Sequence, residues 1–251
     1  MSHPARRAPW LVEAGRRLPD PARDLVKRVR SRAEVGVRSP VRWGSFRRTT
    51  PVNDHYGYGR GTPIDRWYLQ QFMSANRDAF VGRILELQND EWSGRFADSS
   101  EASVTILDID PTNVLATYIA DLDTPGSVEP ATFECVVAPQ TLQYLNDPVS
   151  ALRTLAAACV AGGVLLLTVP TVSRLDETCG PDGDLRRLTP AGLERLLDEA
   201  LPGAGRAVVG FGNVLTSMAF LMGIAAEELD DSELAAHDSR YPMLACARVT
   251  L

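Results

Sequence analysis

The sequence predicts a doubly wound α/β sandwich of three layers, and three observations support that prediction. Strand-length apolar runs alternate with helix-length segments over more than 160 residues, which is typical of a mainly parallel sheet with helices on both faces. Residues 133–138 form an apolar run, as expected of a strand buried on both faces. From there to residue 169 the chain reads strand, helix, Gly-Gly and strand, a crossover unit of about the minimum length.

The first helix of this region is expected to run from about residue 62 to residue 76. Thr62 as N-cap, Pro63 at the first helical position and Asp65 at the third resemble a capping box. Five apolar residues repeat along one face and are expected to be buried: Ile64, Trp67, Tyr68, Phe72 and Met73.

The later elements follow from the same signals. Asp147-Pro148 and Thr189-Pro190 each begin a helix, since Asp and Thr are good N-caps and Pro suits the first turn. The first of these helices is expected to end at Gly162-Gly163. The remaining expected elements are strands at 164–169, 207–215 and 242–251, and an apolar helix at 217–229 that suits either the core or a dimer face.

Three short apolar segments early in the sheet region each end in an acidic residue. They cover residues 84–86, 104–108 and 116–121, and they end at Glu86, Asp108 and Asp121. The carboxyl ends of parallel strands meet at one edge of a sheet, so these carboxylates are expected around one ligand crevice. Glu86 and Asp108 are 22 residues apart, close to the roughly 20 residues between a dinucleotide-binding turn and the acidic residue that binds a ribose.

The charge of the chain is divided unevenly. Residues 1–48 contain 13 Arg or Lys and four Asp or Glu, whereas the other 203 residues contain 13 basic and 28 acidic groups. We therefore divide the chain into a basic N-terminal extension, residues 1–50 with one expected helix at 21–34, and an α/β domain, residues 51–251. The extension could contact RNA, but its aromatic residues are sparse and the acidic body disfavours nucleic acid.

Other classes of protein are disfavoured by what the sequence lacks. The four cysteines form no CxxC pair and no zinc-ligand spacing, so no metal is expected. No GxSxG elbow of a serine hydrolase is present. No apolar run reaches 18 residues, so we expect a cytoplasmic protein without a membrane segment.

The loop at residues 53–61 carries candidates for chemistry. Its three glycines precede a helix, which suits either a phosphate cradle or a turn that simply closes. Tyr56, Tyr58 and Arg60 suit a lid that contacts a substrate. His55 is the best placed of three histidines to act as a general base, although a surface loop histidine is the alternative.

Residues 133–170, FECVVAPQTLQYLNDPVSALRTLAAACVAGGVLLLTVP, together with the pattern around residues 57–68, resemble the class I methyltransferases that depend on S-adenosylmethionine (SAM). The resemblance covers residues 60–251 and implies a Rossmann-like fold. It is nearest to a subgroup associated with glycosyltransferases and natural-product or polysaccharide clusters.

The resemblance implies a set of cofactor contacts. Glu86 takes the position of the acidic residue near the methionine part of SAM, and Asp108 that of the acidic residue on the ribose hydroxyls. Asp121 and Leu122 take the position that meets adenine. Three further residues complete the implied cofactor site: Gln88 in the turn after Glu86, Ile109 beside Asp108, and Gln140 after the fourth strand.

The resemblance also implies where the substrate binds. Thr141 lies at the mouth where cofactor and substrate meet, and Arg174 lies on the loop after the fifth strand, which varies with the substrate. Asp176 and Asp184 share that loop.

The first turn departs from the family pattern. The family has glycines at three positions that are Gln88, Asp90 and Trp92 here. Glycines at such positions let the backbone turn with positive φ and approach the cofactor closely. Gln88 and Trp92 would project bulk into the cofactor space unless the loop is reshaped, and Asn89 or Asp90 could adopt left-handed geometry.

Two functions are therefore expected as alternatives. The first is a SAM-dependent methyltransferase, O- or N-directed, that acts on a sugar or small natural-product acceptor. The second keeps the fold without methyl transfer, either repurposed for another reaction in the same crevice or as a non-catalytic partner.

Overall fold

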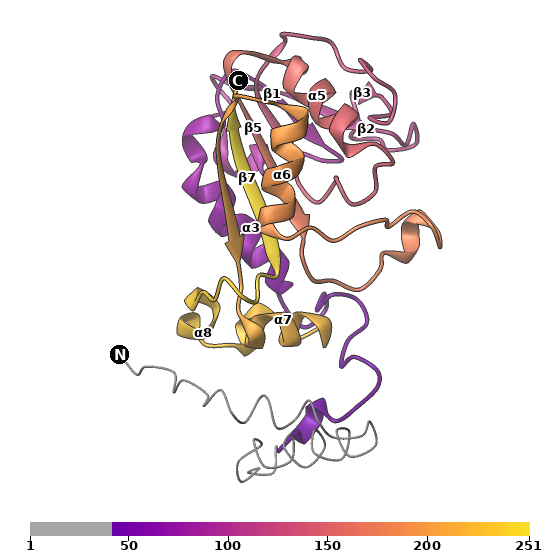
Figure 1. The fold of residues 1–251 in the computed structure, drawn as a ribbon, viewed down its shortest axis with the longest axis vertical. Coiled ribbons are helices and arrows are strands. Elements are labelled where there is room, and N and C mark those ends of the chain that lie inside the picture. The colour runs from indigo at the N-terminus through magenta and orange to yellow at the C-terminus, as the bar shows by residue number, and fades with distance from the viewer. Residues whose placement is uncertain (1–41) are drawn as a thin grey trace, which may run out of the picture. The chain divides into compact units, whose positions relative to one another are not determined.

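Seven strands form one mixed sheet in the computed structural model, which describes residues 42–251 (Figure 1). The strands are β1 Arg83–Leu87, β2 Ser103–Asp108, β3 Tyr118–Ile119, β4 Phe133–Ala138, β5 Cys159–Pro170, β6 Gly205–Phe211 and β7 Leu244–Thr250. Their spatial order is β3-β2-β1-β4-β5-β7-β6, and β7 is antiparallel to both of its neighbours. Because β7 runs in the opposite direction, its first residues lie at the edge where the parallel strands end.

Helices cover both faces of the sheet, which confirms the predicted three-layer α/β sandwich (Figure 1). The α-helices are α3 Ile64–Ala75, α4 Ser93–Phe96, α5 Pro148–Ala158, α6 Pro190–Ala200, α7 Val214–Leu221 and α8 Asp231–Ala235. Short 3-10 turns occupy Gly44–Phe46 (η2), Arg77–Ala79 (η3), Glu177–Cys179 (η4) and Ala226–Glu228 (η5).

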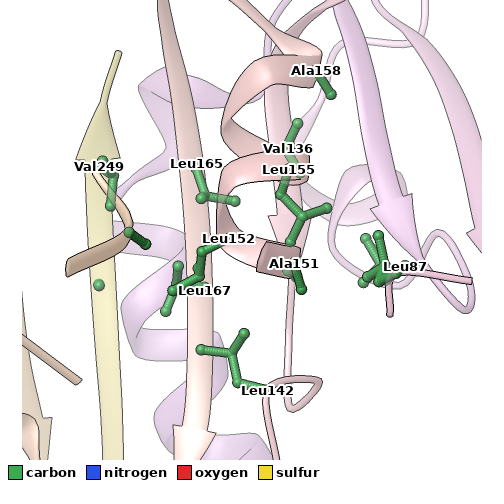
Figure 2. Close-up of a cluster of buried hydrophobic side chains, with 14 of the residues drawn as sticks. Leu87, Val136, Leu142, Ala151, Leu152, Leu155, Ala158, Leu165, Leu167 and Val249 are labelled. Atoms are coloured by element: carbon green, nitrogen blue, oxygen red, sulfur yellow. The ribbon is translucent and has the colours of Figure 1, made fainter. Parts of the chain in front are cut away.

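The core is divided between the two faces by the alternation of side chains along each strand. Leu152 and Leu155 of α5 share one cluster with Leu165 and Leu167 of β5, and Leu85 and Leu87 of β1 belong to it as well (Figure 2). Ile84 of β1 belongs instead to the cluster under α3 and α7. Glu86, two residues after Ile84, therefore points to the α3 face.

The helix caps were predicted well for α5 and α6 but not for α3. The side chains of Asp147 and Thr189 accept hydrogen bonds from the backbone N–H groups of Ser150 and Gly192, respectively. The hydroxyl and N–H of Thr62, in contrast, both donate to the carboxylate of Glu227. The predicted capping by Thr62 was wrong because this distant carboxylate, 165 residues along the chain, takes both groups.

Two predicted boundaries were also wrong. Helix α5 ends at Ala158, and β5 already begins at Cys159, so Gly162 and Gly163 lie within the strand. The predicted helix at 217–229 is interrupted, because α7 ends at Leu221 and Gly223 follows with φ of +68°. A Cβ at Gly223 would lie within 2.7 Å of backbone atoms of Asn53, so the close approach of the two chain segments requires a glycine there.

The cap of α7 supports a stability prediction. The Asn213 side chain accepts from the N–H groups of Leu215 and Thr216, and its amide donates to two carbonyls at α8. We expect Asn213→Ala to lower the free energy of unfolding by about 1–2 kcal/mol, measured by urea denaturation. Thr189→Ala, which removes one capping bond, should cost less; an equal loss would contradict the role of the amide bonds.

The compact unit that carries the sheet begins at Thr49 and ends at Leu251. The predicted helix at 21–34 lies outside the described residues, as does most of the basic extension, so both stay predictions. Among the described helices, none combines the length and the apolar character needed to cross a membrane.

Candidate active site

A polar pocket of about 130 Å³ lies at the carboxyl ends of β4 and β5, and we call it the inner pocket. Its lining includes three carboxylates, three guanidinium groups and three phenols. These residues are Asp65, Asp176, Asp184, Arg66, Arg174, Arg187, Tyr56, Tyr58 and Tyr144. Two glutamines, Gln140 and Gln143, and a few apolar residues complete the wall.

Four separate segments bring these residues together, and the first is the loop at 53–61, which supplies Tyr56 and Tyr58. The first turn of α3 supplies Asp65 and Arg66, and the turn after β4 supplies Gln140 and Gln143. The loop after β5 supplies Arg174 and its neighbours. Since parallel strands end at one edge of the sheet, residues far apart in sequence converge there, as expected for a doubly wound fold.

Unpartnered polar atoms are concentrated in this wall. In residues 42–251, six buried side-chain nitrogen or oxygen atoms have no hydrogen-bond partner. Four of them belong to residues of the inner pocket: Oε1 of Gln140, Oε1 of Gln143, Nε of Arg174 and Nε of Arg187. A buried polar atom without a partner costs free energy, so two donors and two acceptors together indicate a site for a polar ligand.

The three carboxylates of the inner pocket differ in their surroundings. Burial raises the pKa of Asp65 above its ordinary value, although the charge of Arg66 opposes this. Hydrogen bonds from Arg187 lower the pKa of Asp184. Burial would raise the pKa of Asp176, but hydrogen bonds from Thr178 and Tyr144 outweigh it and the pKa is lowered. Asp65 is thus the carboxylate best suited to accept a proton near neutral pH.

A second cavity of about 420 Å³, which we call the outer cavity, adjoins the inner pocket. The two share Tyr56, Arg174 and Phe220 as lining residues. The guanidinium carbon of Arg174 lies 4.2 Å from the centre of the Tyr56 ring, and that ring stacks on Phe220 at 6.1 Å. An aromatic–guanidinium stack therefore forms the common wall of the two spaces.

Glu86 does not reach the crevice beyond β1 and β2. Its side chain is fully buried, and its carboxylate accepts from the N–H groups of Trp92 and Ser93 and from the Ser93 hydroxyl. Burial raises its pKa although these hydrogen bonds oppose the shift. The carboxylate points to the α3 face and holds the start of α4, which disfavours the expected contact between Glu86 and a cofactor; that contact stays a prediction.

Two bulky residues at the glycine positions, Gln88 and Trp92, differ in their surroundings. Trp92 is 1% exposed and belongs to the core under α3, where its ring stacks against Phe96. Gln88 has φ of +74° and its side chain is exposed. The loop is therefore reshaped, as the sequence required, and Gln88 adopts the backbone conformation that glycine would favour.

Asp108 ends β2 in a small hydrogen-bond network. Its carboxylate accepts from the Asn113 side chain at 2.6 Å and from the N–H of Asp110 at 3.0 Å. The same Asn113 amide donates to the carbonyl of Gln88 at 2.7 Å. Asn113, which sequence reasoning missed, thus couples the ends of β1 and β2.

The other predicted cofactor residues lie in varied surroundings. Asp121 is exposed beyond β3, whereas Leu122 is buried in the core. Ile109 is 64% exposed next to Asp108. Gln140 follows β4 with φ of +49°, and its N–H donates to Thr168. Neither the inner pocket nor the outer cavity is lined by these residues, except for Gln140.

Left-handed backbone gathers around this edge of the sheet. In the described chain, only Tyr56, Gln88, Ala131 and Gln140 are non-glycine residues with positive φ. Three of these four are residues that the sequence predicts to bind cofactor or substrate. Such conformations cost free energy and cluster at functional sites, which favours a ligand site here.

The loop at 53–61 is a closed turn and not a phosphate cradle. The Asn53 side chain accepts from the N–H groups of His55 and Gly57, and the N–H of Gly61 donates to the Gly57 carbonyl. These N–H groups are therefore occupied within the loop. Gly57 and Gly59 take positive φ, which explains why glycine suits those positions.

The predicted substrate and base residues separate into two groups. Tyr56, Tyr58 and Arg174 line the inner pocket. His55 is exposed and lines neither cavity, so the structure does not bring it to the candidate site. Arg60 pairs with Glu228, which lies 168 residues further along the chain and could not be predicted as its partner.

Thr141 contributes little to the wall, because its hydroxyl donates to the carbonyl of Pro139. Sequence reasoning missed Gln143, Tyr144 and Arg187 and assigned Asp65 and Arg66 mainly to helix capping. The polar cluster directly after the buried strand β4 was the one available signal for Gln143 and Tyr144. Over residues 42–251, no group of three or more His, Cys, Asp or Glu could hold a metal ion.

Comparison with known proteins gives similarity in structure alone. No protein-family model matches the sequence, and no curated protein matches it either. A SAM-dependent methyltransferase from Archaeoglobus fulgidus is 11% identical with a TM-score of 0.50 over 74% of this chain and 94% of that chain.

Two further solved structures are similar at lower scores. A SAM-dependent methyltransferase from Mesorhizobium loti is 17% identical, with a TM-score of 0.49 over 75% of this chain and 100% of that chain. The N-methyltransferase NodS from Bradyrhizobium japonicum is 15% identical, with a TM-score of 0.45 over 75% and 96%. The chain thus has the Rossmann-like fold that is found in SAM-dependent methyltransferases.

Proposed function

We propose that this protein is a methyltransferase that takes its methyl group from SAM and transfers it to an oxygen or nitrogen of a small polar acceptor. The observation that carries this proposal is the inner pocket at the ends of β4 and β5, where four residues of the wall each have a buried polar atom without a hydrogen-bond partner. The shared fold supports the choice of cofactor by analogy. A sugar or small natural product suits the polar lining.

The residues at the nucleoside end fit SAM. A carboxylate has about four lone-pair sites, and Asp108 uses two of them within the protein. The remaining sites can accept hydrogen bonds from the two ribose hydroxyls. Gln88 has the left-handed backbone that a glycine would favour at this position. Glu86 does not fit a role at the methionine end, because its carboxylate is sealed inside the protein.

The inner pocket supplies the groups that methyl transfer requires. SAM, when bound, supplies an electrophilic methyl group, and the acceptor must lose a proton. Asp65 is half-buried with a raised pKa, so its carboxylate is a stronger base than an exposed one. We therefore assign the proton-accepting role to Asp65 instead of the exposed His55. Gln140 and Gln143 offer carbonyl oxygens that can orient a donor group of the acceptor.

Calorimetric titration with SAM and S-adenosylhomocysteine tests the proposal. We expect micromolar binding to the intact protein and a loss of roughly 10- to 100-fold in Asp108→Ala, since the charged hydrogen bonds to the ribose disappear. Glu101→Ala removes an exposed carboxylate at the opposite end of β2 and should bind normally. Equal binding by both variants would contradict the ribose contact.

The sealed Glu86 favours a second candidate function. A protein of this fold without methyl-transfer activity would not need a free acidic residue near the end of β1. The carboxylate of Glu86 is not free, because it accepts hydrogen bonds from the backbone N–H groups of Trp92 and Ser93. Such a protein would use the inner pocket for another reaction or would act as a non-catalytic partner. Absence of heat with either ligand at millimolar concentration favours this second function.

A further inference from the structure

We propose that the molecule bound in the inner pocket carries a carboxylate and that Arg174 binds it, at the wall shared with the outer cavity. This inference rests on the proposed function only in naming that molecule as the acceptor. Binding of a carboxylate to Arg174 can itself be measured without SAM.

Arg174 is the guanidinium of the inner pocket without a carboxylate partner. Arg66 pairs with Glu91 and Arg187 with Asp184. Within residues 42–251, no carboxylate lies within 4.0 Å of Arg174. Its Nη1 donates to the Leu175 carbonyl at a long 3.3 Å, and its Nε is buried without a partner. A guanidinium presents a planar fork of donors that matches a carboxylate in two parallel hydrogen bonds.

The neighbouring acids do not take this position. Both oxygens of Asp176 already accept hydrogen bonds, one from Tyr144 at 2.9 Å and the other from Thr178. Asp184 is bound by Arg187 and by the N–H of Asp176. Arg174 lies close enough to Asp176 to lower the pKa of that carboxylate. Because the two groups form no ion pair, Asp176 balances the positive charge of Arg174 only in part. A single negative charge suits this position, whereas a doubly charged phosphate would be repelled by the three acids of the pocket.

Arg174 is held in place for such a contact. Its guanidinium lies over the Tyr56 ring, which in turn stacks on Phe220. Tyr56 has φ of +56°, a conformation that is unfavourable for a bulky residue and is retained only under constraint. Only Nη1 of the guanidinium donates to a protein group within residues 42–251, which leaves the Nη2 donors for a ligand.

Arg187 adds a second donor on the same wall. Its Nη2 donates to the backbone carbonyl of Arg174 at 2.6 Å, so its guanidinium lies beside the backbone at residue 174, and its Nε is also buried without a partner. The outer cavity next to this wall is lined by Pro51, Leu175, Phe220 and Leu221, and also by the polar residues Asn53, Asp54 and Glu177. The carboxylate would thus sit on Arg174 where the polar pocket meets a mainly apolar space, which suits an acid with an apolar group.

Ligand-observed NMR without SAM tests this proposal. The probes are 4-hydroxyphenylacetate and its neutral amide, each titrated to 20 mM, with inorganic phosphate as a further arm. We expect the acid to bind at least tenfold more tightly than the amide, and Arg174→Gln to abolish the difference. Arg240→Gln is the matched control, because Arg240 also lies over a tyrosine but outside both cavities.

Each outcome decides the question. Equal binding of acid and amide, no binding of the acid, or an unchanged preference in Arg174→Gln with a normal melting temperature would overturn the proposal. Preferential binding of phosphate would show that the site takes a different anion. A positive titration alongside failed SAM binding would sustain the carboxylate site while removing the proposed methyl transfer, so the two failures are distinguishable.

Discussion

Replacing Trp92 by alanine is expected to lower the free energy of unfolding by about 3–5 kcal/mol, the range for truncation of a buried tryptophan. The Trp92 ring is 1% exposed and stacks on Phe96 at 6.5 Å, with the Arg95 guanidinium 5.5 Å from its centre. The backbone N–H of Trp92 donates to the buried carboxylate of Glu86, and alanine retains that donor. The truncation therefore acts by leaving a large cavity beneath α3. Urea denaturation followed by circular dichroism measures the loss.

Trp43→Ala provides the matched control, because Trp43 is 49% exposed and its truncation should change stability by less than about 0.5 kcal/mol. Trp92→Phe should recover part of the loss, since it refills some of the space. A Trp92→Ala variant as stable as the intact protein would show that the ring is not part of the core. The crevice would then have to accommodate it.

The fold could be predicted from sequence because its signals are local. Buried parallel strands are apolar runs, and Asp147 and Thr189 are N-caps followed directly by proline. Both kinds of signal act within a few residues. The prediction for α3 failed where a distant group intervened, since Glu227 takes the hydroxyl that Thr62 would use as a cap.

The candidate site was predicted only in part. The position of a residue along a strand predicts the edge of the sheet at which it lies, but not the face of the sheet to which its side chain points. Asp108 and Gln140 lie at the expected strand ends. Glu86 is the last residue but one of the adjacent strand, and pleating turns it to the α3 face, where Trp92 and Ser93 cover it. The tryptophan at a position where the family has glycine then anchors the turn in the core beside it.

The inner pocket was harder still to predict. Tyr144 and Asp176 are 32 residues apart and form one hydrogen bond, while Asp65 comes from another part of the chain. No periodicity connects such residues, and only the folded sheet brings them together. Arg174 could be placed on the correct loop, but its lack of a carboxylate partner becomes visible only in three dimensions.

Asp65→Asn is expected to lower the rate of methyl transfer by about 10²–10⁴-fold, the range for loss of a general base, while it makes the protein more stable at neutral pH. The amide keeps the size of the side chain and can still accept the hydrogen bond that the Arg66 N–H gives to Asp65. It cannot accept a proton from the acceptor. The rate is measured as acceptor-dependent release of S-adenosylhomocysteine, and the stability by urea denaturation between pH 4 and pH 8.

The two effects have one physical cause. Burial raises the pKa of Asp65 in the folded protein, so its stabilising contribution is fully present below the unfolded pKa and is lost as pH rises through the folded pKa. Above that range the ionised, partly desolvated carboxylate destabilises the fold, and Asp65→Asn removes this cost. The activity of the intact protein should instead fall as the pH is lowered, because protonation of Asp65 removes the base.

Asp184→Asn gives the matched comparison with the opposite sign. Hydrogen bonds from Arg187 lower the pKa of Asp184, so its stabilising contribution is present above the unfolded pKa and is lost as pH falls through the folded one. This variant should therefore be less stable than the intact protein at neutral pH, and the difference should shrink in acid. If both variants changed stability in the same direction, the raised pKa of Asp65 would be refuted. The reason for preferring Asp65 over His55 as the base would then be lost, because a carboxylate with an ordinary pKa is a weak base at neutral pH.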